Sequence, residues 1–171
     1  NGKQTAAMTK IFEALGTPYI IHQPRYNMFN RQAEQDLFPV LQATHKAAVG
    51  FSSLSQGLLT DKYLHGIATD SRANKQTIPF LSPVQVEQTL TTVKRLNEVA
   101  QQREQSLAQM ALAWNLRQPA LASVLIGASR PEQVINNVAA LKNLEFGTAE
   151  LATIEQILAE QPAIDWNAGR V

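Results

Sequence analysis

The chain has 171 residues, of which 44% are hydrophobic, and its 15 Lys and Arg nearly balance its 14 Asp and Glu. This composition is typical of one globular domain with a sizeable core, and the net charge of +1 favours neither a nucleic-acid nor a membrane partner. The absence of cysteine excludes disulfides, thiolate catalysis and Cys-rich zinc sites, and it agrees with a cytoplasmic location.

The first third of the sequence predicts two helix–strand units. Apolar residues at helical spacing predict a helix over residues 4–15, and the apolar run 19–21, which lies between two prolines, predicts a short buried strand. A second amphipathic pattern predicts a helix over 33–45. The run 47–51 then predicts a second strand.

The segment 52–83 is long, polar and interrupted by Gly and Pro. Loops of this length inside a compact domain are usually functional or disordered, and we expect a short helical turn at 57–59. Ser106 and Gln109 form a capping-box pattern at the start of a later helix. The remaining predicted elements are helices over 86–102 and 106–116, a strand over 122–126, a helix from Pro131 and a last helix from about Thr148.

Strands that alternate with helices predict an α/β fold built from parallel βαβ units. Both a doubly wound sheet and part of a (β/α)8 barrel are compatible with this order, since a full barrel usually takes about 250 residues.

Each predicted strand is followed by a polar cluster. The clusters begin at His22, at Ser52 and at Gly127. Because ligands of parallel α/β folds bind at the carboxyl ends of strands, three clusters on one edge predict a small-molecule site.

The third cluster has the pattern of a phosphate site. Gly127 to Arg130 is a turn of small residues with one hydroxyl and one guanidinium, and Pro131 and Glu132 then open a helix whose free N–H groups suit a phosphate. The alternative is a strand–turn–helix unit that binds nothing.

Other polar residues have ordinary explanations beside the functional ones. His22 is interpreted as a residue at the rim of the sheet rather than a base, and the three histidines lack metal-ligand spacing, so no metal is predicted. Ser52 and Ser53 lack a nucleophile elbow. Phe51 suits either the core or a stack on a flat ring.

Three segments resemble the carboxyl-terminal half of an aldo-keto reductase: IHQPRYNMFNR at 21–31, GFSSLSQGLLTDKYLHGI at 50–67 and SVLIGASRPEQVINN at 123–137. They are most similar to the bacterial L-glyceraldehyde 3-phosphate reductase and potassium channel β-subunit branches. The resemblance runs from Tyr19 to about Ile157. It implies a partial (β/α)8 TIM barrel, namely the last three βα units and a C-terminal helix, with 1–171 as a single region. The amino terminus begins as though in mid-sequence, which also predicts a fragment.

By this resemblance the chain would bind NADPH extended across the carboxyl ends of its strands. Gln23 would hydrogen-bond the nicotinamide carboxamide, and Phe51 would stack on the nicotinamide ring. The other implied contacts are Ser52, Leu54, Ser55, Gln56, Gly57 and Lys62 at the pyrophosphate, Ser129, Arg130 and Gln133 at the 2′-phosphate, and Asn136 and Asn137 at the adenine. Many relatives carry Glu at the position of Asn136 and Arg at that of Gln133, so the preference for NADPH over NADH stays open.

The family's catalytic Asp, Tyr, Lys and His lie on its first four strands, so no catalytic residue is assigned in this chain. The resemblance therefore implies the cofactor-binding half of an NADPH-dependent oxidoreductase that reduces aldehydes or ketones, inactive alone, with the N-terminal half of the barrel as its partner and homo-oligomers as a further expectation. Two alternatives are a nucleotide-sensing regulatory module of the channel β-subunit type and an unrelated α/β phosphate-binding domain.

Overall fold

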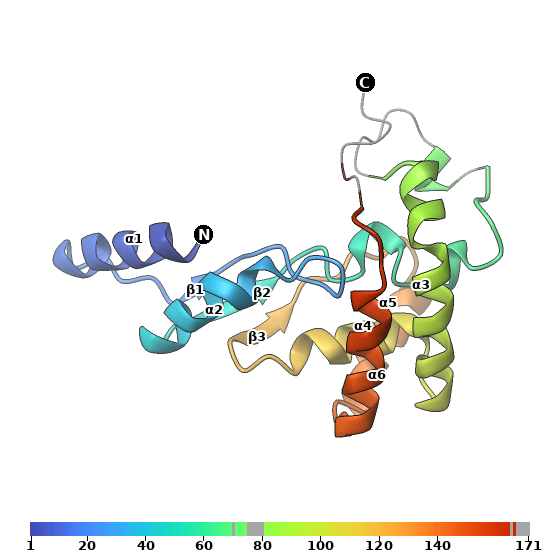
Figure 1. Ribbon diagram of the computed structural model, residues 1–171. Coiled ribbons are helices and arrows are strands. Elements are labelled where there is room, and N and C mark those ends of the chain that lie inside the picture. The colour runs from blue at the N-terminus through green and yellow to red at the C-terminus, as the bar shows by residue number, and fades with distance from the viewer. Residues whose placement is uncertain (70, 75–80, 165, 167–171) are drawn as a thin grey trace.

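The computed structural model describes residues 1–69, 71–74, 81–164 and 166, and its centre is a three-stranded parallel sheet (Figure 1). The strands lie in the order β1 (Ile21–His22), β2 (Ala47–Gly50) and β3 (Leu121–Val124). Their register pairs Ile21 with Ala47 and Gly50 with Val124. The predicted alternation of helices with parallel strands is confirmed.

The helices gather at the two ends of the sheet (Figure 1). Near β1, α1 packs against α2, whereas α3 contacts both α4 and α6 at the other end. The helices are α1 (Gly2–Ala14), α2 (Gln32–Ala43), α3 (Pro83–Gln102), α4 (Leu107–Leu116), α5 (Pro131–Val138) and α6 (Thr148–Ala159).

Local capping explains where the long helices begin. The side chain of Gln109 accepts a hydrogen bond from the Ser106 backbone N–H at 2.9 Å, which confirms the predicted capping box of α4. Helix α3 begins at Pro83, three residues before the predicted start, because the Gln85 side chain accepts the Ser82 backbone N–H at 2.9 Å and proline is well accommodated in the first turn.

The polar segment after β2 contains three short 3-10 turns in its described part: η1 (Ser55–Gly57), η2 (Asp61–Tyr63) and η3 (Arg72–Asn74). The turn predicted at 57–59 thus lies two residues earlier, as η1. Thr60 begins η2, because its hydroxyl accepts the N–H of Lys62 at 3.2 Å. Residues 75–80 of the predicted loop lie outside the described residues.

The core is built around Trp114 of α4, which is fully buried. The ring of Tyr26 stacks on it at 5.6 Å between centroids, and Phe38 meets Tyr26 edge-on at 5.0 Å. Arg117 lies over the indole with its guanidinium carbon 3.9 Å from the ring centroid. Aromatic side chains of this size dominate the apolar area that a small domain buries, so this stack joins α2 and α4 to the loop after β1.

The prediction that the first strand is buried is wrong for the described residues, and the third strand is partly exposed as well. Ile20 is 75% exposed, and Ile21, Leu125 and Ile126 are also exposed. The reason is topological: β1 and β3 are the two edges of the sheet, so each has one side that no described strand pairs. Ile135 on α5 is 72% exposed as well, and large apolar patches of this kind usually mark an interface.

Candidate functional site

The three polar clusters predicted at the strand ends lie at the same end of the sheet, where the strands finish. Beyond the ends of β1 and β2, Arg25 and Phe51 continue the parallel pairing, with hydrogen bonds from Phe51 N–H to Pro24 and from Tyr26 N–H to Phe51. The N–H of Leu125 donates to Gly50 at 2.7 Å. The parallel register therefore confirms that these clusters lie at the same end of the sheet.

The turn after β2 has a strained backbone. Three non-glycine residues adopt left-handed conformations, with φ of +56° at Ser52, +47° at Ser55 and +60° at Gln56. Such conformations cost roughly 1–3 kcal/mol each and persist only where the surroundings hold them. Leu54 anchors the turn by packing on the core, and Gly57, with φ of +98°, ends it.

Two buried asparagines hold this turn. Asn27 donates a side-chain hydrogen bond to the Ser52 carbonyl at 2.9 Å, and Asn115 donates to the Ser53 carbonyl at 3.2 Å. Both asparagines are buried. We did not predict their role, although Asn115 is a conspicuous polar residue near the end of a mostly apolar helix.

The first two predicted contacts lie at the ends of β1 and β2. Phe51 is half-buried, and the Arg25 guanidinium carbon lies 5.8 Å from its ring centroid. Gln23 directly follows β1 and is exposed. An exposed amide and a half-buried ring on adjacent strands are suited to hold a flat carboxamide-bearing ring.

The start of α5 directs several donors at one point. The side-chain oxygen of Gln133 accepts from the Ser129 backbone N–H at 2.8 Å, the Ser129 hydroxyl at 3.2 Å and the Arg130 backbone N–H at 3.3 Å. A phosphate oxygen at a helix start requires the same convergence of donors. The geometry of 129–133 therefore fits an anion, with Gln133 as the present acceptor.

Asn136 and Asn137 are in different environments. The Asn136 side chain accepts a hydrogen bond from Gln109 at 2.9 Å and donates to the Ser106 hydroxyl at 3.2 Å, so it joins α5 to the start of α4. Asn137 is 8% exposed. The two predicted adenine contacts therefore differ, since one amide is already used in a helix–helix link.

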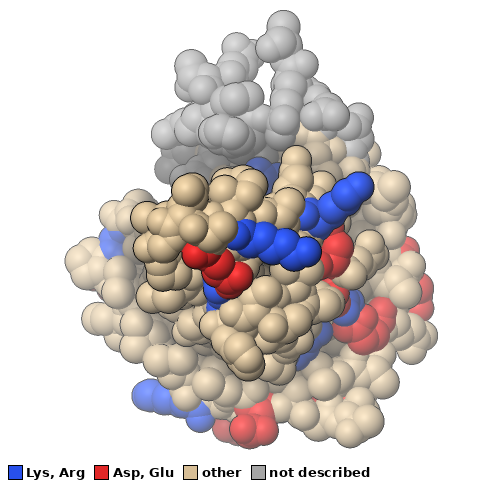
Figure 2. Space-filling view, turned by 90° about the vertical axis from the view of Figure 1, so that its left-hand side faces the viewer, with Lys and Arg blue, Asp and Glu red and all other residues tan. Residues whose placement is uncertain are grey.

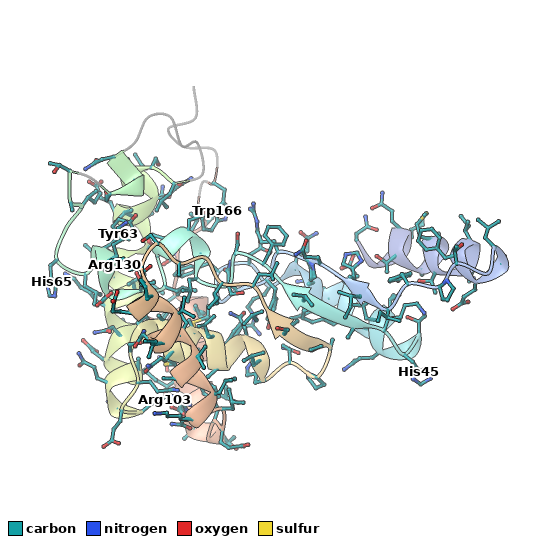
Figure 3. All side chains as sticks on the ribbon, turned by 180° about the vertical axis from the view of Figure 1, so that it is seen from behind. His45, Tyr63, His65, Arg103, Arg130 and Trp166 are labelled. Atoms are coloured by element: carbon teal, nitrogen blue, oxygen red, sulfur yellow. The ribbon has the colours of Figure 1, made fainter. Side chains whose placement is uncertain are left out.

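Lys62 is exposed on η2, with its ammonium nitrogen 5.7 Å from the ring centroid of Tyr63. Figure 3 shows Tyr63, Trp166 and Arg130 at the same end of the molecule, whereas His45 lies at the opposite end. Among the described residues there is no cluster of His, Asp or Glu that could hold a metal ion.

The three tyrosines of this chain take part in the packing and hydrogen bonding of the fold. Tyr26 is buried and donates to Glu34 at 2.5 Å, and burial together with this carboxylate raises the pKa of the Tyr26 phenol. Tyr63 is buried in a second apolar cluster, and the Tyr19 hydroxyl is bonded to Thr9. Burial lowers the pKa of His22 on β1. The described contacts of the three phenols are thus with the fold itself.

Charges are dispersed over the surface at the α1 end of the molecule (Figure 2). Basic and acidic side chains alternate there among uncharged residues, and neither sign forms a broad patch. This face of the molecule therefore carries no wide basic field. No helix in the described part of the chain is long and apolar enough to cross a membrane.

Comparisons with known proteins identify the family of the chain. The sequence profile of the Aldo/keto reductase family matches residues 2–159. The chain belongs to the aldo/keto reductase family. It is 44% identical over 170 residues to "L-glyceraldehyde 3-phosphate reductase" of Escherichia coli K12, an alignment that covers 97% of this chain and 49% of that protein.

A protein of Schizosaccharomyces pombe that is named for a voltage-gated potassium channel β-subunit is 34% identical over 148 residues, or 84% of this chain and 43% of that protein. The chain of this aldo/keto reductase thus spans about half the length of the relatives it matches. Among solved structures, glycerol dehydrogenase from Gluconobacter oxydans has the same fold over 91% of this chain and 47% of its own, with a TM-score of 0.73 and 24% identity.

Proposed function

We propose that this chain is the cofactor-binding half of an NADPH-dependent aldo-keto reductase that reduces small aldehydes or ketones to alcohols in the cytoplasm. The observation that carries the proposal is the convergence of three donors from Ser129 and Arg130 on one oxygen. These donors lie at the carboxyl end of the sheet, as do Phe51 and Gln23. This arrangement suits a long ligand with a flat ring at one end and a phosphate at the other.

Each cluster at the carboxyl end of the sheet would hold one part of NADPH. Gln23 and Phe51 would orient the nicotinamide, which supplies the hydride when the cofactor is bound. The strained turn 52–57 would follow the pyrophosphate, with Lys62 nearby. Ser129 and Arg130 would bind the 2′-phosphate after Gln133 turns away. Asn137 would face the adenine.

The acid–base part of the reaction would come from another segment. The tyrosines of this chain contact its own core and helices, which supports the proposal that an N-terminal half supplies the proton donor and completes a (β/α)8 barrel against the edges of β1 and β3. The exposed apolar residues at these edges support this partner, because an unpaired sheet edge is otherwise a template for aggregation. Homo-oligomers remain a further proposal.

The relative named for L-glyceraldehyde 3-phosphate supports a small phosphorylated aldehyde as the first substrate to test. A second function, nucleotide sensing by a regulatory module, is favoured by the likeness to the protein named for a channel β-subunit. The two functions differ in turnover, since a sensor would bind NADPH tightly and reduce aldehydes slowly or not at all.

The test compares the complete polypeptide with the 171-residue chain. We expect the complete polypeptide to quench NADPH fluorescence on binding and to oxidise NADPH when glyceraldehyde 3-phosphate is added. The isolated chain should oxidise none. Turnover by the isolated chain would overturn the proposal that another segment supplies the acid–base residues. A complete polypeptide that binds no NADPH would overturn the whole proposal.

A further inference from the structure

A polar pocket lies beside the proposed nicotinamide site. It is lined by Arg25 and Asn30 from the segment after β1, by Ser52, Ser55 and Gln56 from the turn after β2, and by Trp166 near the carboxyl end. Arg25 also faces the ring of Phe51. The pocket therefore lies between the ring of Phe51, where the nicotinamide would stack, and the turn that would follow the pyrophosphate.

Arg25 stands out among the arginines. Of those whose side chains the structure describes, only Arg25 and Arg130 form no ion pair, since the other four have acidic partners: Arg31 with Glu34 and Glu155, Arg95 with Glu160, Arg103 with Glu150 and Arg117 with Glu155. The proposed 2′-phosphate accounts for Arg130. Arg25 is thus a second arginine with no acidic side chain as its partner. Its planar guanidinium carries several N–H donors, which suit the phosphate or carboxylate group of a ligand.

Asn30, the neighbour of Arg25 in the pocket, lies on a loop that is held in place before any ligand binds. The Asn27 side-chain oxygen accepts the backbone N–H groups of Phe29 and Asn30, both at 2.9 Å, so the loop has a fixed shape. The Asn30 side chain is half-buried and makes no hydrogen bond with the described residues. Its amide is therefore available to a ligand in the pocket.

We propose that Arg25 and Asn30 bind the phosphate of a short phosphorylated aldehyde, an inference that rests on the proposed reductase function. A reacting carbonyl lies about 3–3.5 Å from its hydride donor. With bonds of ~1.5 Å, the terminal phosphate of a three-carbon aldehyde lies about 5 Å farther on. The Arg25 guanidinium carbon lies 5.8 Å from the centroid of the ring on which the nicotinamide would stack, so a substrate whose phosphate turns toward the pocket would bring it to Arg25.

The pyrophosphate of the cofactor offers the same chemistry, so the experiment separates the two sources. In the complete polypeptide, R25Q is compared with the wild type for kcat/KM on glyceraldehyde 3-phosphate, for kcat/KM on unphosphorylated glyceraldehyde, and for the Kd of NADPH. The matched control is R95Q, which removes a surface arginine on α3.

We expect R25Q to lower kcat/KM for glyceraldehyde 3-phosphate by about 10- to 100-fold, mainly through KM, because a charge-assisted contact is lost. The values for glyceraldehyde and for the Kd of NADPH should change by less than about 2-fold. R25K, which keeps the charge but loses the planar fork, should give an intermediate loss. R95Q should behave as the wild type.

An equal loss on both aldehydes would overturn the proposal, as would no loss on either. A raised Kd for NADPH would assign Arg25 to the pyrophosphate instead. If the wild-type protein reduces glyceraldehyde and R25Q keeps the wild-type ratio of kcat/KM for glyceraldehyde 3-phosphate to kcat/KM for glyceraldehyde, only this inference fails. If the wild type binds no NADPH and reduces neither aldehyde, the proposed function fails with it. Circular dichroism of R25Q and R25K identifies a folding defect, and R25K supplies the answer where R25Q does not fold.

Discussion

The side-chain oxygen of Gln133 lies 2.8 Å from the backbone nitrogen of Ser129 and 3.2 Å from its hydroxyl. Gln133 thus accepts hydrogen bonds from the same donors that the 2′-phosphate of NADPH would need. A negative charge at this position should keep the donors occupied and repel the phosphate. It should also favour the start of α5, because Glu at the third helical position completes a capping box.

We therefore predict that Q133E weakens NADPH binding by about 10-fold or more while NADH binding changes little. Fluorescence titration of the complete polypeptide with both nucleotides measures this difference, and Q35E on the exposed face of α2 is the matched control. Equal weakening of both nucleotides, or a lowered thermal stability of Q133E, would show that Gln133 acts only on the helix.

The adjacent asparagines of α5 should separate stability from binding. Asn136 bonds both Gln109 and Ser106, so N136A should lower the free energy of unfolding by about 1 kcal/mol. N137A should instead raise the Kd of NADPH by about 5- to 10-fold. Urea unfolding and nucleotide titration of the two variants provide the comparison. The reverse pattern, with N136A impaired mainly in binding, would restore Asn136 as an adenine contact.

The order of elements in this fold could be predicted because its signals are local. The capping pair Ser106–Gln109 and the apolar spacing of α2 act within one or two turns of helix. The convergence of the polar clusters was also predictable, since parallel strands bring their carboxyl ends to one edge.

Burial of the outer strands could not be predicted, because Ile20 and Leu125 are apolar in sequence whether or not a neighbouring strand covers them. The role of Asn115 was missed for a similar reason: its hydrogen bond to Ser53 spans 62 positions. The use of Gln133 as an internal acceptor likewise depends on a side-chain conformation that no sequence pattern specifies.

The exposed apolar face of α5 leads to a prediction with opposite signs in two contexts. Ile135 is 72% exposed, and Val134 and Val138 beside it are also exposed. If an N-terminal half covers this face, I135E should lower the free energy of unfolding of the complete polypeptide by about 2 kcal/mol, through lost apolar burial. In the isolated chain the same change should raise solubility.

T153E, at an exposed position of α6, is the control for added charge. Denaturant unfolding of the complete polypeptide and the soluble yield of the isolated chain are the two measurements. A complete polypeptide that tolerates I135E as well as T153E would mean that α5 faces solvent. A cooperatively unfolding monomer of the isolated chain would argue against the need for a second half.

Glu34 provides a pH-dependent test of the core. Its carboxylate accepts hydrogen bonds from Tyr26 at 2.5 Å and from Arg31 at 2.8 Å. Burial alone would raise the pKa of Glu34, but the hydrogen bonds from Arg31 and Tyr26 and the charge of Arg31 outweigh it and hold the pKa below its ordinary value of 4.5. Because the pKa is lowered in the folded state, the stabilisation is present above the unfolded pKa and is lost as pH falls through the folded one.

E34Q should accordingly lower the free energy of unfolding of the complete polypeptide at pH 7 by about 2 kcal/mol, the size of a charge-assisted hydrogen bond. The difference between E34Q and wild type should persist at pH 6 and shrink as the pH falls below 4.5, because the wild-type carboxylate then becomes protonated. Urea unfolding at several pH values measures it, with E87Q on the exposed face of α3 as the control. A difference that stays constant down to pH 3 would mean that Glu34 acts through packing and not through its charge.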